Sequence, residues 1–194
     1  MYRKNAWKNY GEAERAKLEA FAADYRGYLD ASKTEREAAA AAEAICLEKG
    51  FRDLDALIDG GAALKPGDRV YRKWMNKSFM AFVIGAEPIE KGMNILGAHI
   101  DSPRIDVKQN PLFEDDSLAY LDTHYYGGIK KYQWLALPLA LHGVAVKKDG
   151  TAVEVVIGEG ENDPVLCISD LLPHLAQEQM AKTATKFIDG EALN

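Results

Sequence analysis

Residues 93–101 read Met93-Asn94-Ile95-Leu96-Gly97-Ala98-His99-Ile100-Asp101, and this stretch places the chain in the α/β class. A short run that is apolar on both faces is typical of a central strand in a sheet that helices cover. Side chains alternate along a strand, so His99 and Asp101 share a face. A neutral imidazole binds zinc well, and a neighbouring carboxylate orients the ring and raises its basicity. The pair therefore predicts half of a metal site.

The same pair has a plainer interpretation, in which a buried histidine is satisfied by an adjacent aspartate at the end of a strand. Its context favours the metal site, because open α/β sheets place their sites at the carboxyl ends of strands. Ser102-Pro103 follows directly and predicts a sharp turn at that point.

The composition indicates a soluble globular protein with one large domain or two small ones. The chain has 194 residues, of which 47% are hydrophobic and 28% charged, and its formal net charge is −6. An acidic chain needs a concentrated basic patch to bind nucleic acid. Cys46 and Cys167 make no disulfide framework, which favours a reducing compartment. The N-terminus shows no signal peptide and the longest apolar run, residues 134–141, is too short for a bilayer, so we expect a cytoplasmic protein without membrane contact.

Hydrophobic periodicity and turn residues divide the chain into helices at the N-terminus and strands after residue 69. Helices are predicted at 12–29 and from the capping box of Thr34 and Glu37 to a stop at Gly50. Strands are predicted at 70–74, 78–84, 93–98, 118–126, 139–147, 151–158 and 164–168, and a last helix from Asp170 to about Thr185. Lys148-Asp149-Gly150 predicts a solvated hairpin turn. The best domain boundary lies near residues 103–110.

Other polar residues are also candidates for a functional site. Residues 124–134 mix aromatic side chains with two lysines, as in single-strand binders, but a Gly-Gly turn between strands explains them better. His142 lies inside a predicted strand and is expected to be packed, whereas His174 near a helix start is first interpreted as a capping or surface histidine. The carboxylates Glu87, Glu90 and 114–116 are interpreted as loop residues.

Three motifs occur in an order that is specific to one family. They are Gly97-Ala98-His99-Ile100-Asp101-Ser102-Pro103-Arg104, Thr123-His124-Tyr125-Tyr126-Gly127-Gly128-Ile129-Lys130-Lys131-Tyr132-Gln133-Trp134 and Ile168-Ser169-Asp170-Leu171-Leu172-Pro173-His174-Leu175. Together they resemble the N-terminal part of bacterial members of the aspartyl aminopeptidase family, which are cytoplasmic di-zinc metallopeptidases. The resemblance runs over the whole chain.

The resemblance implies an α/β fold, in which part of a zinc-peptidase catalytic domain is followed by an inserted β-rich dimerisation domain. Residues 1–103 would belong to the catalytic domain and residues 104–194 to the insertion, through which dimers build a larger homo-oligomer. His99 would bind one of two zinc ions, and Asp101 would hold its ring and help to set the acidity of the metal-bound water. His174 would lie in the segment that reaches the active site of a neighbouring subunit. The substrate would be a peptide, with its N-terminal residue, acidic in some members, removed.

The other parts of the family's site have no counterpart in this chain. A bridging Asp, a Glu-Glu pair, a further Asp and a distal His all come later in the family, and one histidine does not complete a zinc shell. We therefore expect the 194-residue chain to be inactive by itself and to be a fragment of a longer peptidase. The alternative is a non-catalytic oligomerisation module derived from such a peptidase, and nucleic-acid binding is a distant third.

Overall fold

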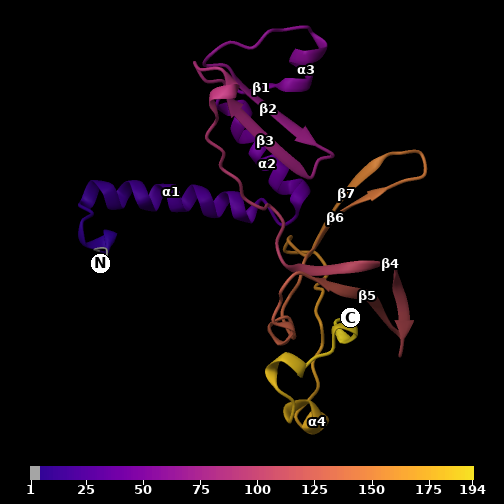
Figure 1. The fold of residues 1–194 in the computed structure, drawn as a ribbon. Coiled ribbons are helices and arrows are strands. Elements are labelled where there is room, and N and C mark those ends of the chain that lie inside the picture. Colours follow the sequence, from indigo (N-terminus) through magenta and orange to yellow (C-terminus); the bar gives the residue numbers. More distant parts are fainter. Residues whose placement is uncertain (1–4) are drawn as a thin grey trace. The chain divides into compact units, whose positions relative to one another are not determined.

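The structure is a computed structural model that describes residues 5–194, and its contacts divide the chain into unit 1, Met1–Asp101, and unit 2, Ser102–Asn194 (Figure 1). The helices are α1 (Glu12–Asp30), α2 (Glu35–Glu48), α3 (Leu54–Asp59) and α4 (Gln177–Met180), and the strands are β1 (Arg52–Asp53), β2 (Arg69–Trp74), β3 (Ser78–Val83), β4 (Arg104–Asp115), β5 (Leu118–Tyr126), β6 (Leu141–Val146) and β7 (Ala152–Ile157). None of the helices in residues 5–194 has the length and apolar character needed to cross a membrane.

The two N-terminal helices form where the sequence predicts them. At the start of α2, the Thr34 hydroxyl accepts a hydrogen bond from Glu37 N at 3.3 Å, and the Glu37 carboxylate accepts one from Thr34 N at 2.8 Å. This reciprocal pair satisfies two donors that a helix start leaves unpaired, and it confirms the capping box. Gly50 follows the helix with φ +76°, the left-handed conformation expected of a helix stop.

The core of unit 1 lies between α2 and a three-stranded sheet of order β1-β2-β3. Ala38 and Ala39 of α2 and Val70 and Tyr71 of β2 are its buried residues. Small alanine side chains let the helix lie close to the sheet. Burial raises the pKa of the Tyr71 phenol, and a hydrogen bond with Glu43 raises it further. Glu43 also forms an ion pair with Lys73 of β2, so helix and sheet are joined by apolar contact and by the polar contacts of one glutamate.

The predicted strand at residues 93–98 is wrong for this structure. The segment has no regular secondary structure, and no strand among residues 5–194 pairs with it. Leu96 is 100% and Ile95 77% exposed. An apolar run becomes a buried strand only where neighbouring strands bond its backbone and helices cover it, and the described residues supply neither here.

Unit 2 is built from two separate antiparallel ribbons, β4–β5 and β6–β7 (Figure 1). Register shifts within β4, where Val107 pairs with Thr123 but Leu112 pairs with Leu121, so four residues of β4 oppose Asp122 alone. This is a special bulge, with more than two residues opposite one, around Asn110-Pro111, where proline donates no ladder hydrogen bond. Strands β5, β6 and β7 confirm the predicted strands and the hairpin turn, whereas β4 was not predicted.

Two predicted elements near the C-terminus are wrong or much shorter. Residues 164–168 form only isolated bridges, Leu139 with Leu166 and Leu135 with Ile168. The predicted helix at 170–185 is reduced to the four residues of α4. Asp170 does not cap a helix, because its carboxylate accepts a hydrogen bond from the next amide, Leu171 N, at 2.8 Å.

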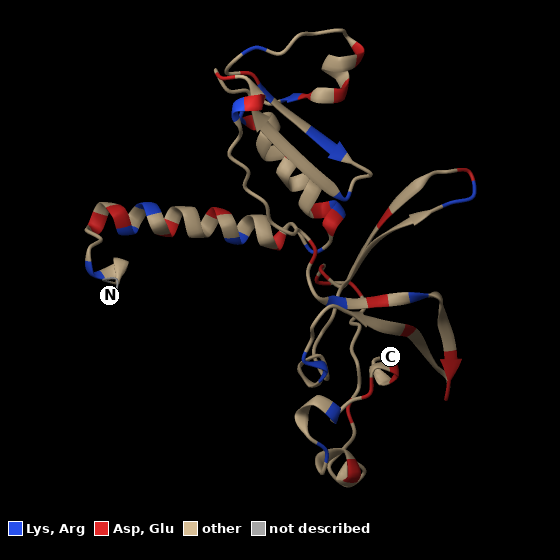
Figure 2. Cartoon of the chain, in the orientation of Figure 1, with Lys and Arg blue, Asp and Glu red and all other residues tan. Residues whose placement is uncertain are grey.

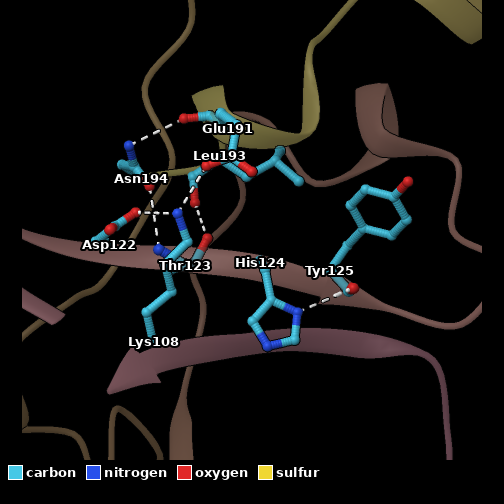
Figure 3. Close-up of polar contacts among 8 residues, drawn as sticks. All are labelled: Lys108, Asp122, Thr123, His124, Tyr125, Glu191, Leu193 and Asn194. Atoms are coloured by element: carbon cyan, nitrogen blue, oxygen red, sulfur yellow. Dashed lines mark hydrogen bonds and ion pairs between the residues drawn. The ribbon is translucent and has the colours of Figure 1, made fainter. Parts of the chain in front are cut away.

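The C-terminal residues fold back onto β5 and close the core of unit 2 (Figure 3). Leu193 is fully buried and forms that core with Ile168 and Ile188. Its carbonyl accepts a hydrogen bond from the Thr123 hydroxyl, and Thr123 N donates to Asn194 Oδ1 at 3.2 Å. A segment some 70 residues away from β5 in sequence is thus fixed by both apolar and polar contacts.

A lysine at the bulge strengthens the same junction (Figure 3). Lys108 Nζ lies 2.7 Å from Glu191 Oε2 and 3.0 Å from Asp122 Oδ1. The hydrogen bonds that the Lys108 ammonium donates, first to Glu191 and then to Asp122, raise its pKa. Gly190 lies against the Tyr125 ring so closely that a Cβ there would come within 2.8 Å of it, so a larger residue at 190 would push the segment away.

A tight turn follows β7. Gly158 has φ +101°, and a Cβ there would lie 2.9 Å from the Leu139 carbonyl, so only glycine fits. Asp163 Oδ2 accepts hydrogen bonds from Gly160 N at 3.0 Å and Gly158 N at 2.9 Å. These two amides lower the pKa of the Asp163 carboxyl, because they stabilise its charged form.

The core of unit 2 predicts a large effect of Leu193→Ala. Removing a buried leucine side chain costs about 2–5 kcal/mol, and unit 2 has few other buried residues. Urea unfolding monitored by Trp134 fluorescence, in a background in which Trp7 and Trp74 are Phe, measures the loss, since Trp134 packs against this core. Leu172→Ala is the matched control, because Leu172 is 68% exposed, and we expect a change within about 0.5 kcal/mol. Equal effects of both variants would contradict this description of the core.

The Asp163 turn predicts a local dependence on pH. Since its folded pKa is lowered, the carboxylate stabilises the turn above the unfolded pKa of about 3.9, and this contribution is lost as pH falls through the folded value. Amide exchange at Gly158 and Gly160 should therefore become faster, relative to the intrinsic rate, on acidification. Asp163→Asn should remove the pH dependence and Glu161→Gln should leave it unchanged. An unchanged dependence in Asp163→Asn would rule out this carboxylate as its source.

Candidate functional site

The His99–Asp101 pair forms in the structure, although its segment is not a strand. His99 Nδ1 lies 2.9 Å from the Asp101 carbonyl oxygen and 3.2 Å from Asp101 Oδ1. A carbonyl oxygen only accepts, so Nδ1 carries the proton and Nε2 keeps a free lone pair. The His99 side chain is 80% exposed. The geometry therefore presents Nε2 to an incoming metal ion, with Asp101 holding the opposite corner of the ring.

One histidine is a single ligand of a zinc site, and the described residues do not complete the shell. Within residues 5–194 no three His, Cys, Asp or Glu side chains gather closely enough to hold a metal ion. Zinc in proteins takes three or four protein ligands. The pair thus fits one corner of a zinc site, whereas the donor set of residues 5–194 does not fit a whole one.

His174 belongs to unit 2 and lies in the exposed turn before α4. The turn forms because the Leu172 carbonyl accepts hydrogen bonds from Leu175 N at 2.9 Å and Ala176 N at 3.1 Å. A hollow of about 420 Å³ beside it is lined by Asp170, Leu171, Pro173, Ala176, Gln179, Met180 and Phe187. His174 is thus accessible, and its catalytic role stays a prediction.

The remaining histidines are held by local contacts. His142 Nε2 lies 3.0 Å from Glu159 Oε1, with its side chain 13% exposed, which agrees with the expected packed residue. His124 is exposed on β5, and its Nδ1 lies 3.3 Å from the Tyr125 carbonyl oxygen (Figure 3). Neither belongs to a metal-binding cluster of the described residues.

Arg104 is a charged residue that the sequence analysis did not single out. Its Nε lies 2.7 Å from Asp106 Oδ1, and its guanidinium lies over the Tyr126 ring, 4.4 Å from the centroid. The alternation Arg104-Ile105-Asp106-Val107 was the available signal, because residues two apart on a strand share a face. The ion pair and the ring fix the start of β4, directly after the candidate pair in sequence.

The comparisons with known proteins point to one family. The family model described as "Aminopeptidase I zinc metalloprotease (M18)" matches residues 28–192. The "Probable M18 family aminopeptidase 1" of Clostridium acetobutylicum is 51% identical over 191 residues, which are 98% of this chain and 41% of the relative. The chain therefore spans about two fifths of the length of such relatives.

Solved structures agree with the family match. The crystal structure of the M18 aminopeptidase from Thermotoga maritima is similar with a TM-score of 0.88 at 41% identity, covering 100% of this chain and 41% of that one. The aminopeptidase I structure from Clostridium acetobutylicum has a TM-score of 0.84 at 48% identity, covering 98% and 42%. The mApe1 dodecamer of S. cerevisiae, with a TM-score of 0.66 at 20% identity and coverage of 84% and 37%, shares the fold. The mixed helix and strand architecture is thus that of M18 aminopeptidases.

The incomplete ligand set predicts that zinc does not stabilise the 194-residue chain. A ligand that binds the folded state raises stability with concentration, and a lone histidine binds zinc too weakly to do so. We expect the urea midpoint to be the same with micromolar zinc and with a chelator. His99→Ala should behave identically. A zinc-dependent rise of the midpoint that His99→Ala abolishes would show that the chain holds zinc without further ligands.

Proposed function

The chain belongs to the aminopeptidase I zinc metalloprotease (M18) family, and we propose that it is the N-terminal portion of a zinc-dependent aminopeptidase. The whole protein would remove N-terminal residues from peptides. The observation that carries the proposal is the His99–Asp101 contact, in which Nδ1 is used for the hydrogen bond and the lone pair of Nε2 on an exposed ring stays free for a metal ion.

His99 is proposed as a zinc ligand and Asp101 as its positioning residue. An aspartate that accepts a hydrogen bond from Nδ1–H fixes the ring and raises the basicity of Nε2, which strengthens its bond to a metal. The further ligands, a second zinc ion and a glutamate that serves as general base would come from other parts of the whole protein. Zinc, when bound there, would polarise the scissile carbonyl and acidify its water. A preference for acidic N-terminal residues is proposed from the resemblance alone.

Residues 1–103 are proposed as part of the catalytic domain and residues 104–194 as the β-rich dimerisation insertion. The contact-based division at Asp101/Ser102 lies close to this boundary. His174 is proposed to contribute to the active site of a neighbouring subunit, and its exposed turn leaves it accessible. We further propose a cytoplasmic homo-oligomer, as the free Cys46 and Cys167 suit a reducing compartment.

A non-catalytic oligomerisation module is the second candidate. It is favoured by one observation, the lack of a group of three metal-binding side chains within residues 5–194. The two candidates differ in whether unit 1 supports catalysis once the rest of an M18 protein is present.

A chimera tests the proposed function. In the Clostridium acetobutylicum relative, this chain replaces the matching stretch of 191 residues. We expect zinc binding and release of N-terminal residues from a panel of peptides that begin with Asp, Glu, Leu or Met. His99→Ala in the chimera should lower kcat/KM at least about 100-fold, and Asp101→Asn about 10- to 100-fold, with loss of zinc measured by mass spectrometry.

His142→Gln is the matched control, because His142 also pairs with a carboxylate but lies outside the proposed site. It should leave zinc content and kcat/KM within about twofold of the parent chimera. A folded chimera without activity would favour the oligomerisation module. An active one in which His99→Ala changes neither zinc nor rate would remove His99 from the site.

A further inference from the structure

The β4–β5 ribbon ends in an acidic tip, residues 112–119. Glu114, Asp115 and Asp116 are exposed there, and the sequence has no Lys or Arg between Lys108 and Lys130 (Figure 2). The bulge around Asn110-Pro111 separates this part of the ribbon from the part that carries the C-terminal segment. The acidic tip therefore contains no basic side chain, and Arg104 and Lys108, the basic residues of the same ribbon, lie on the other side of the bulge in ion pairs with Asp106, Asp122 and Glu191.

The acidic tip also carries an apolar hollow of about 460 Å³. Its lining consists of Leu112, Phe113, Glu114, Ser117, Leu118 and Ala119. Leu112 is 72% and Leu118 58% exposed, and Phe113 is held in place by stacking on Tyr120 at 5.2 Å between centroids. An apolar floor with a carboxylate at its rim matches a lysine side chain, which combines an apolar stem with a terminal ammonium.

The β6–β7 ribbon ends in a lysine tip, residues 146–151. Asp149 Oδ1 accepts a hydrogen bond from Thr151 N at 2.9 Å. This bond lowers the pKa of the Asp149 carboxyl and holds the carboxylate against the backbone of the turn. Neither Lys147 nor Lys148 forms a salt bridge with any residue of the part described, 5–194. Val146, beside them, is 67% exposed. The lysine tip thus presents two unpaired cations next to an apolar side chain.

The two tips do not meet within one chain. The ribbons are separate sheets, and Figure 2 shows the lysine tip and the acidic tip at different ends of unit 2. A two-stranded ribbon is marginal alone and gains stability from a partner. A second copy of the chain offers the opposite charge to both tips at once, so that one two-fold axis would repeat the same contact twice.

From this complementarity we propose that the acidic tip of one copy binds the lysine tip of a second copy, with Lys147 or Lys148 in the hollow lined by Leu112, Phe113 and Leu118. The two tips would form the surface between subunits. The proposal rests on the proposed function only in assuming a homo-oligomer. Charged pairs at the rim set orientation and partner choice, while the apolar parts exclude water.

Charge reversal of either tip tests the contact in the 194-residue chain. One variant is Glu114→Lys/Asp115→Lys, which spares Asp116 because its φ of +47° belongs to the turn. The other is Lys147→Glu/Lys148→Glu. By sedimentation equilibrium, each variant alone should self-associate at least about tenfold more weakly than the parent chain, because both of its tips then carry the same sign.

Mixing the two variants is the decisive arm, because one then carries two basic tips and the other two acidic tips. The mixture should form hetero-oligomers with a Kd within about threefold of the parent chain, and it should weaken at 1 M salt. Glu161→Lys/Lys182→Glu is the matched control and should associate like the parent chain. Far-UV circular dichroism verifies that each variant is folded.

Three results would overturn the proposal: a parent chain that is monomeric at all concentrations, variants that associate as the parent chain does, or a mixture of folded variants that stays monomeric. The last two would assign the subunit contact to other surfaces or the tips to another protein. Sedimentation of the tip variants measures only the mass of the assembly, whereas the chimera experiment measures zinc content and turnover. If the chimera is inactive but the mixed variants form hetero-oligomers, the peptidase proposal is rejected and the contact is kept. If the chimera is active but the mixed variants stay monomeric, the contact is rejected and the peptidase proposal is kept.

Discussion

Unit 2 depends on the burial of Leu193. Neither ribbon has a core of its own, and the buried residues Ile168, Ile188 and Leu193 all come from segments that follow β7. The polar contacts of Thr123 with Leu193 and Asn194 then fix the register of this segment against β5. A leucine fills the space, and the hydrogen bonds to Thr123 decide where along the strand it sits. The irregular chain around α4 is therefore held by its end rather than by its own secondary structure.

The sequence predicted those elements whose causes are local. The capping box of α2, the Gly50 stop and the hairpin turn of β6–β7 each rest on residues a few positions apart, and all three form. The failures are elements that need distant partners. Residues 93–98 have the composition of a buried strand but no neighbour among residues 5–194, and the segment at 164–168 finds only single bridges. The composition of a segment shows that it can form a strand, but the strand forms only where another strand pairs with it.

The sequence predicted the contact between His99 and Asp101, but the structure forms it in a different way from the one expected. Alternation along a strand was expected to bring His99 and Asp101 together, yet they meet in an irregular segment through the Asp101 backbone carbonyl as well as its carboxylate. Two residues this close in sequence can make the contact without being part of a sheet. The other ligands could not be predicted, because the described residues contain no group of three that could hold a metal. Arg104 was missed because β4 was missed.

The position of Leu193 also has a consequence for how the protein is made. Unit 1 builds its core from segments close in sequence, with α2 directly before its sheet, so it can fold while the ribosome is still adding residues. The contact between Thr123 and Leu193 spans about 70 residues and waits until the last of them has left the exit tunnel. During that interval β4 and β5 are complete but uncovered. An uncovered two-stranded ribbon exposes its strand edges, which favour association between incompletely folded chains.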